Sequence, residues 1–287
     1  MDSYVVELFF ITFVAATVNG ALGYGFSSIT VPLALLFLTN RVLNPALVLI
    51  EVVLNAWVLW VNYEAGSRVW RRLLPVLIGL APGVVVGTLI VSEVSPDWLK
   101  LVTYFTLLPL ILFQAAGYRR PIQSEKSAGL VFGAGLGVLY SVTTISGPPL
   151  AVALNNQGFA KREFRASLGA IRLAESSMTA VAYGSAGLLT GESLGLIPQI
   201  LPGVALGVPL GALLIRHVRV ETFRRICMSF DAWIVAFGIS TLFRSLQIIE
   251  GYGAYLIMGT VGLIDACLLY RFFSGASYRM QLKDERA

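Results

Sequence analysis

A glycine-broken apolar segment occurs twice in this chain, once near the start and once at the middle. The first copy, within residues 5–39, is interrupted by Asn19-Gly20-Ala21-Leu22-Gly23-Tyr24-Gly25. The second, within residues 127–157, runs through glycines at 133, 135 and 137 to Ser146-Gly147-Pro148-Pro149. In a bilayer a broken helix persists only where it is buried in protein or lines a watery cavity, because every backbone polar group needs a partner. Paired breaks at matching places in two halves predict the substrate site of a transporter.

Composition places the chain in a membrane. Of its 287 residues, 56% are hydrophobic and 13% are charged, against about 25% charged in a soluble domain. Apolar segments lie at 5–39, 45–62, 73–91, 99–117, 127–157, 166–189, 194–215, 222–243 and 248–273. The net charge of +5 comes from basic residues between these segments, which is typical of cytoplasmic loops and not of a nucleic-acid surface. We therefore expect an all-α polytopic membrane protein with no nucleic-acid partner.

The first and fifth apolar segments are too long for single spans. As a continuous helix either would be roughly 45–50 Å long, whereas the hydrocarbon core is about 30 Å thick. Because each segment has glycines near its middle, we expect each to form two half-helices. The sequence thus predicts two broken, re-entrant helical hairpins.

Charge between the segments predicts how they cross the membrane. The connections at 64–72, 118–126, 158–165 and 216–225 carry at least three basic residues each, whereas those at 92–98 and 190–193 are acidic. Basic connections face the cytoplasm, so the second hairpin should enter and return there and the first on the outside. Arg41 runs against this assignment. We expect an integral protein of the cell (inner) membrane, with its N-terminus outside and its C-terminus cytoplasmic.

Each half then contains one hairpin and three full spans. Because three crossings are an odd number, the two copies must be inverted, as in many transporters. Matching residues support the duplication: Pro75, Gly79 and Gly83 in the first half, and Pro202, Gly207 and Gly211 in the second. We expect a first repeat at 1–118, a second at 119–246, and an extra transmembrane helix with a cytoplasmic tail at 247–287.

The breaks predict an anion site. A half-helix that begins at mid-membrane presents unpaired N–H groups and the positive end of its dipole. Ser146 is a good N-cap residue and Gly147 allows close approach, so we expect this break to be the main contact. The expected substrate-binding residues are Asn19, Gly20, Gly23, Gly25, Ser27, Ser28, Thr143, Thr144, Ser146, Gly147 and Arg172. For any single glycine, close helix packing is the competing interpretation.

Five charged residues fall inside predicted spans, where each is costly and indicates function: Glu51, Arg172, Glu175, Asp231 and Asp265. Glu51 and Glu175 are candidates for proton coupling, or for hydrogen bonds to backbone exposed at the breaks. Arg172 could attract the substrate, pair with Glu175 on its own helix, or reach the membrane surface. Asp231 and Asp265 permit an alternative from another class, an intramembrane aspartyl protease. With one histidine and no Cys-x-x-C, no metal or other cofactor is expected.

Several of these residues form a recognisable set. They are Asn19-Gly20-x-x-Gly23-x-Gly25 leading to Pro32-Leu33, and Ser146-Gly147-Pro148-Pro149 with Gln157-Gly158 and Phe164-Arg165. In their order and duplication the chain resembles the sulfite exporter TauE/SafE family of membrane transporters over most of its length. The resemblance implies a secondary transporter, not an enzyme, that moves small anions such as sulfite, thiosulfate or organosulfonates like sulfoacetate. An anion channel is the alternative within transport.

Overall fold

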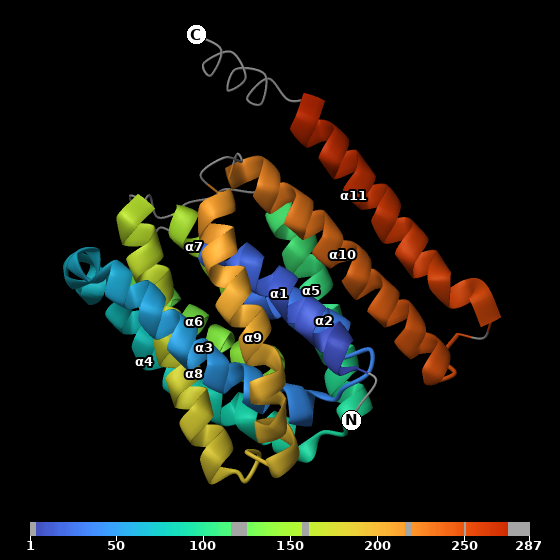
Figure 1. The fold of residues 1–287 in the computed structure, drawn as a ribbon, viewed down its shortest axis with the longest axis horizontal. Coiled ribbons are helices and arrows are strands. Elements are labelled where there is room, and N and C mark those ends of the chain that lie inside the picture. Colours follow the sequence, from blue (N-terminus) through green and yellow to red (C-terminus); the bar gives the residue numbers. More distant parts are fainter. Residues whose placement is uncertain (1–3, 116–124, 157–160, 216–219, 250, 275–287) are drawn as a thin grey trace.

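The computed structural model describes residues 4–115, 125–156, 161–215, 220–249 and 251–274, and these residues form helices without any strand. The helices are α1 (Val5–Leu22), α2 (Phe26–Ala34), α3 (Asn40–Val61), α4 (Tyr63–Glu93), α5 (Pro96–Ala115), α6 (Glu125–Thr143), α7 (Gly147–Asn156), α8 (Lys161–Ser185), α9 (Gly191–Leu214), α10 (Val220–Ser245), the short 3₁₀ helix η1 (Gly251–Tyr255) and α11 (Leu256–Ser274) (Figure 1). Six of them contain stretches long and apolar enough to cross a membrane. The all-α polytopic membrane fold is therefore confirmed.

Both long apolar segments are divided into two helices at the positions that their glycines and serines predicted. The first break separates α1 from α2, and α2 packs back against α1. Gly23 and Gly25 have φ angles of 83° and 107°, in the left-handed region that glycine enters at little cost. The second break separates α6 from α7 and turns on Thr144, whose φ is 56°. We refer to residues 23–25 as the first break and to residues 144–146 as the second break.

All four connections predicted as basic loops are partly helical, the 118–126 connection only from Glu125 on. α4 begins at Tyr63, α8 at Lys161 and α10 at Val220, so Arg71 and Arg165 lie on helices and not in loops. Hydropathy marks only the part of a helix that fits the hydrocarbon core, whereas charged residues with good helix propensity extend it into the interface. Most of the 118–126 connection, the Gln157-Gly158 pair and the C-terminal tail lie outside the described residues.

The two halves of the chain pack against each other rather than side by side as separate bundles. α1 lies along α9, α6 lies along α4, α3 packs on α8, and α5 packs on α10. If each helix of α1–α5 is exchanged for its counterpart in α6–α10, the α1–α9 pair becomes the α4–α6 pair, and the α3–α8 and α5–α10 pairs are unchanged. Glycines allow the close approach: a Cβ at Gly20 would overlap backbone of α9, one at Gly211 backbone of α1, and one at Gly83 backbone of α6. At these positions the packing interpretation of the glycines is confirmed.

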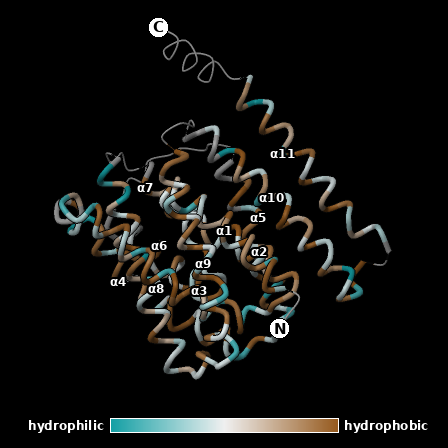
Figure 2. Tube along the Cα trace, viewed as in Figure 1, coloured by the Kyte–Doolittle hydropathy of each residue, from teal (hydrophilic) through white to brown (hydrophobic). Residues whose placement is uncertain are grey.

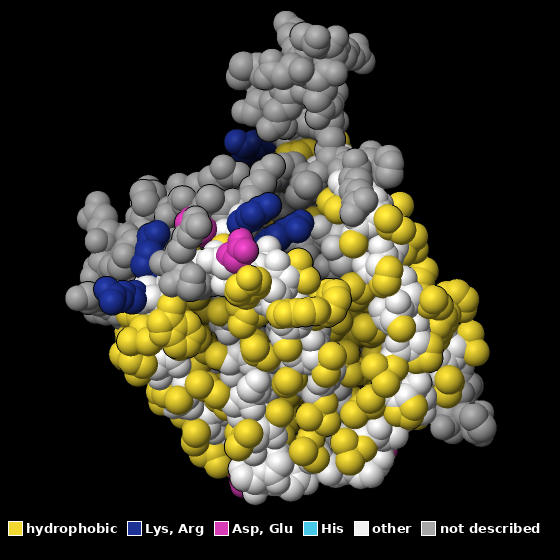
Figure 3. Space-filling view, turned by 60° about the vertical axis from the view of Figure 1, so that its left-hand side comes forward, with side chains coloured by type: hydrophobic (Ala, Val, Ile, Leu, Met, Phe, Trp, Pro, Cys, Tyr) yellow, Lys and Arg dark blue, Asp and Glu magenta, His cyan; other side chains and the backbone are white. Residues whose placement is uncertain are grey.

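Hydrophobic side chains cover the outside of the bundle. Brown stretches alternate with white ones along the helices in Figure 2, and in Figure 3 a hydrophobic surface lies below a band of Lys and Arg side chains. Large apolar residues such as Val131 and Leu263 are both 72% exposed, which suits contact with lipid and not with water. α11 lies at the edge of the bundle along α10, and only Val261 and Asp265 of it are buried (Figure 1).

Candidate functional site

The two breaks meet inside the bundle. A Cβ built on Gly147, the first residue of α7, would lie 3.3 Å from the side chain of Tyr24 in the first break. Pro148 of α7 and Gly25, which precedes α2, line one small cavity. The N-terminal ends of α2 and α7 therefore lie next to each other, as the pairing of the breaks predicted.

Glu51 of α3 is the centre of a buried polar cluster. Its Oε1 accepts hydrogen bonds from Ser27 at 2.8 Å and from Arg172 at 2.6 Å, and its Oε2 accepts one from Tyr140 at 2.7 Å. All four side chains are buried. Hydrogen bonds from a cationic donor to a carboxylate are among the stronger ones in proteins, so this cluster ties α3 firmly to α2, α6 and α8. Tyr140 was not among the residues predicted for the site, although a tyrosine in an apolar, glycine-rich span carries a hydroxyl that needs a partner.

Glu175 of α8 takes the corresponding place at the second break but has fewer partners. Ser146 donates to its Oε2 at 2.5 Å, while its Oε1 has no hydrogen-bond partner among the described residues. The ion pair of Arg172 is with Glu51 of α3 rather than with Glu175 on its own helix. Arg172 is 2% exposed, so the interpretation that it reaches the membrane surface is wrong. Its Nε and Nη1 have no partner in the described chain.

Hydroxyl groups and neighbouring helices hold the second break in place. The hydroxyl of Thr143 accepts the N–H of Ile145 at 3.0 Å, and that of Thr144 donates to a backbone carbonyl at 2.7 Å. Asn44 of α3 donates to the carbonyl of Val142 at 2.8 Å, and Tyr183 of α8 donates to that of Ser141. The predicted hydroxyls of α6 therefore stabilise the break itself.

A cavity of about 150 Å³ reaches the first break, and we call it the polar cavity. Asn19, Gly20 and Gly23 of α1 line it, together with Asn62 at the end of α3 and the exposed Arg165 at the start of α8. One water needs only about 10–15 Å³ of such volume, so the polar cavity has room for a small oxyanion with water. Three predicted binding residues thus come together in one place.

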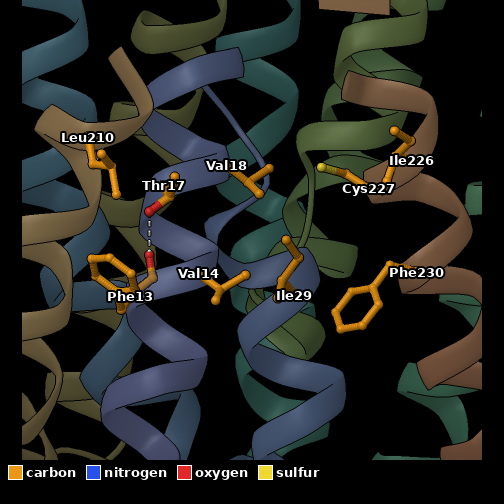
Figure 4. A pocket seen from close by; sticks show the side chains of 9 residues that line it. All are labelled: Phe13, Val14, Thr17, Val18, Ile29, Leu210, Ile226, Cys227 and Phe230. Atoms are coloured by element: carbon orange, nitrogen blue, oxygen red, sulfur yellow. Dashed lines mark hydrogen bonds between the residues drawn. The ribbon is translucent and has the colours of Figure 1, made fainter. Parts of the chain in front are cut away.

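A second cavity beside the same hairpin has different chemistry. It measures about 350 Å³ and lies between α1, α2, α9 and α10, lined by the nine residues drawn in Figure 4. Thr17 carries the only hydroxyl among them, and it donates to the carbonyl of Phe13 at 2.8 Å. An anion would find no donor there, so this apolar cavity is not a candidate for substrate binding.

The two intramembrane aspartates do not form one site. Asp265 accepts hydrogen bonds from Arg225 at 3.0 Å, Ser229 at 3.1 Å and Trp233 at 3.2 Å, and thereby ties α11 to α10. Asp231 lies two residues from both Ser229 and Trp233, which turns it by about 200° to the opposite face of α10. There it lines a cavity beside the first break. The protease alternative, which needs two adjoining carboxylates, is wrong.

Arg41 has a structural role. Its guanidinium donates to the carbonyls of Val91 at 3.0 Å, Ser92 at 2.5 Å and Val94 at 3.1 Å. These carbonyls close the C-terminal end of α4, where a cation is favourable. This capping accounts for Arg41 at an end of the bundle that also carries the acidic residues Glu93 and Asp97.

Comparison with known proteins gives the chain a family. A model of the sulfite exporter TauE/SafE family matches residues 8–240, which include both breaks and most of α10. The chain belongs to the TauE/SafE family. Members of this family are membrane transporters of sulfur anions and not enzymes. No curated protein and no solved structure matches the chain. α11 lies outside the region matched by the TauE/SafE model.

Proposed function

We propose that this protein is a secondary transporter that moves sulfite, thiosulfate or an organosulfonate such as sulfoacetate across the cell (inner) membrane by alternating access. The family supports a sulfur anion as the substrate class. The polar cavity carries the proposal for the site, because it leads from the Arg165 end of the bundle to the first break. A small anion that follows this path meets the positive end of α2.

We infer that the first break makes the main contact with the anion. The first turn of α2 leaves the N–H groups of Phe26, Ser27 and Ser28 without intrahelical partners. α7 begins Gly147-Pro148-Pro149, and because proline has no N–H, only the Gly147 N–H is available there. The number of available backbone donors favours the first break over the second, whereas Ser146 and Gly147 in the sequence had predicted the second break as the main contact. In this proposal Thr143, Thr144 and Ser146 position α7 beside the site.

Of the two glutamates at the breaks, Glu175 suits proton coupling better. Glu51 already accepts three hydrogen bonds, one of them from Arg172, so a proton there would break an ion pair. Glu175 has one donor and an Oε1 without a partner in the described residues. A proton on that oxygen would remove a buried charge without breaking a contact.

We propose an inverted repeat for α1–α5 and α6–α10, at residues 1–118 and 119–246, with 247–287 beyond it. The helix contacts support this repeat, because α1 packs on α9 in the same way that α6 packs on α4. Exposed Arg71, Arg72 and Arg165 lie near one end of the bundle and Glu93 and Glu192 near the other, so the first end should face the cytoplasm. The N-terminus is then outside, the C-terminus inside, and the polar cavity opens to the cytoplasm.

Flux measurements on purified protein in proteoliposomes test the function. We expect uptake of sulfite, thiosulfate or sulfoacetate well above that of sulfate, and a dependence on a pH gradient that Glu175→Gln weakens. A carrier gated by μs–ms motions makes at most about 10³–10⁶ cycles per second, so larger single-channel currents would identify a channel instead. Rates equal to those of empty liposomes for all four anions would contradict the proposal.

A matched pair of leucine substitutions tests the breaks. Gly147→Leu should abolish flux, because its side chain must displace Tyr24. Gly135→Leu, at a position on α6 with no atom within 4 Å of a built Cβ, should leave flux unchanged. Both variants should elute as folded protein in detergent. Normal flux in folded Gly147→Leu protein would show that the meeting of the breaks is not needed for transport.

A further inference from the structure

Asp231 of α10 lies beside the N-terminal end of α2 and has no role in the function proposed so far. It lines a cavity of about 20 Å³ with Tyr24, Gly25 and Ser28 of the first hairpin and Pro148 of α7. Its side chain is buried, and its Oδ1 has no hydrogen-bond partner among the described residues. We call this space the Asp231 cavity. Its volume is enough for about one water.

A buried carboxylate with one oxygen that lacks a partner is costly as an anion, and a nearby positive group lowers that cost. No Lys or Arg lines the Asp231 cavity. Arg172 is paired with Glu51, and Arg225 is paired with Asp265 on the other face of α10. The remaining source of positive potential is the first turn of α2, which begins beside Gly25 and Ser28. Asp231 therefore occupies the same helix end that the proposed function assigns to the transported anion.

We propose that Asp231 is a built-in counter-anion, which stabilises the end of α2 when no substrate is bound and takes up a proton when the transported anion binds there. The proposal rests on the function proposed above. Two negative groups in one small buried site strongly oppose each other's charge, so the anion binds with a neutral Asp231. One proton moves from water to the carboxylate, and no covalent bond to the anion forms.

Few other titratable groups face Asp231. Tyr24 and Cys227 line its cavity, and α5 contributes Ile111. Tyr104 of α5 donates to the carbonyl of Pro32 at 2.9 Å, and α2 has no charged residue. The residues of α1 that line the cavity are Val18 and Leu22, and neither is titratable. Asp265 of α11 accepts a hydrogen bond from Arg225 on the opposite face of α10. Asp231 is thus the one carboxylate among the residues that line this cavity.

Thiosulfate binding to the full-length protein in detergent tests the proposal, with calorimetry in buffers of different ionisation enthalpy to count protons. Thiosulfate is the probe because it does not titrate between pH 6 and 8, whereas sulfite does. We expect wild type to take up about one proton per bound anion at pH 7.5. Its affinity for thiosulfate should then fall about tenfold for each unit by which the pH rises, because one proton is bound together with each anion. Asp231→Asn should take up none and bind equally at every pH.

Matched variants make the result specific to this carboxylate. Asp97→Asn, the same change at an exposed site on α5, should behave as wild type. Asp231→Ser, with a smaller side chain, repeats the test and should also bind without proton uptake. Proton uptake that persists in Asp231→Asn, or is lost instead in Glu175→Gln, would overturn the proposal.

The wild-type protein separates this proposal from the proposed function. Wild type that transports thiosulfate but binds it without proton uptake would overturn the role of Asp231 and leave the transport function standing. Wild type that neither binds nor transports any sulfur anion would instead contradict the function itself.

Discussion

The two breaks occupy corresponding places in the two halves, yet they are built differently. The first turns on Gly23 and Gly25, with left-handed φ angles of 83° and 107°, and is bordered by the polar cavity and the Asp231 cavity. The second turns on Thr144 and is tied by side chains, including the 2.8 Å bond from Asn44 to the Val142 carbonyl. The first break therefore borders two cavities, whereas the second break is packed within the core.

This difference suggests separate roles for two duplicated elements. The first break offers three backbone donors at the end of α2 and can be reached from the Arg165 end of the bundle. On the opposite side, Tyr183 bonds to the Ser141 carbonyl, and the Ser141 and Thr179 hydroxyls lie 3.2 Å apart. In the proposed transporter, the path to the first break is open at one end of the bundle, and the hydrogen bonds around the second break close the other end. Alternating access requires one open and one closed end at a time.

The largest expected effect separates the two glutamates. Glu51→Gln should lower the free energy of unfolding by about 3–5 kcal/mol, because Arg172 stays buried without its ion pair. Glu175→Gln should lower it by only about 1 kcal/mol, since one hydrogen bond from Ser146 is weakened. Thermal unfolding in detergent measures both.

The double variant Glu51→Gln with Arg172→Gln is the control for the ion pair. It should recover part of the loss, because no uncompensated charge remains in the core. Equal destabilisation by Glu51→Gln and Glu175→Gln would remove the distinction between the two breaks.

A smaller effect is expected from the backbone of the breaks. Gly25→Ala forces a Cβ onto a residue with φ 107° and places it 3.1 Å from Val18, at a cost of about 1–3 kcal/mol. Because this residue precedes α2, we expect flux to fall about tenfold, the equivalent of 1.4 kcal/mol. Thr144→Gly relieves its strained φ and should keep flux within about twofold of wild type.

Gly187→Ala is the matched control for Gly25→Ala. Gly187 also has a left-handed φ, of 71°, but no atom lies within 4 Å of its built Cβ. It should lose similar stability and keep wild-type flux. If Thr144→Gly impairs flux more than Gly25→Ala does, the second break is the functional one.

The smallest expected effect concerns access to the first break. Arg165→Gln removes a positive charge from the rim of the polar cavity and should raise the KM for thiosulfate by about two- to fivefold at low salt. The difference should disappear near 1 M salt, where the Debye length is about 3 Å. Arg162→Gln, an exposed arginine on the same helix that does not line the cavity, should change KM little. Equal effects of the two variants would mean that the polar cavity is not the route to the site.

Local patterns in the sequence were sufficient for much of the fold. Apolar runs, glycines and Ser146-Gly147 predicted the spans and both breaks because hydropathy, turn propensity and capping depend on residues a few positions apart. Helix ends were placed less well, as α4 shows by beginning at Tyr63. Of the residues expected to bind the anion, Asn19, Gly20 and Gly23 line one cavity, and Gly20 also packs against α9. Their role in binding stays a prediction.

The sequence by itself determined an all-helical membrane protein with two broken helices, because the bilayer imposes those requirements on each segment separately. Tertiary structure alone decided the partners. Arg172 pairs with Glu51, 121 residues away, although Glu175 is three residues along its own helix. Asp231, which the protease alternative paired with Asp265, lies instead at the end of α2. Such contacts depend on which faces of distant helices pack together, and periodicity along one helix does not contain that information.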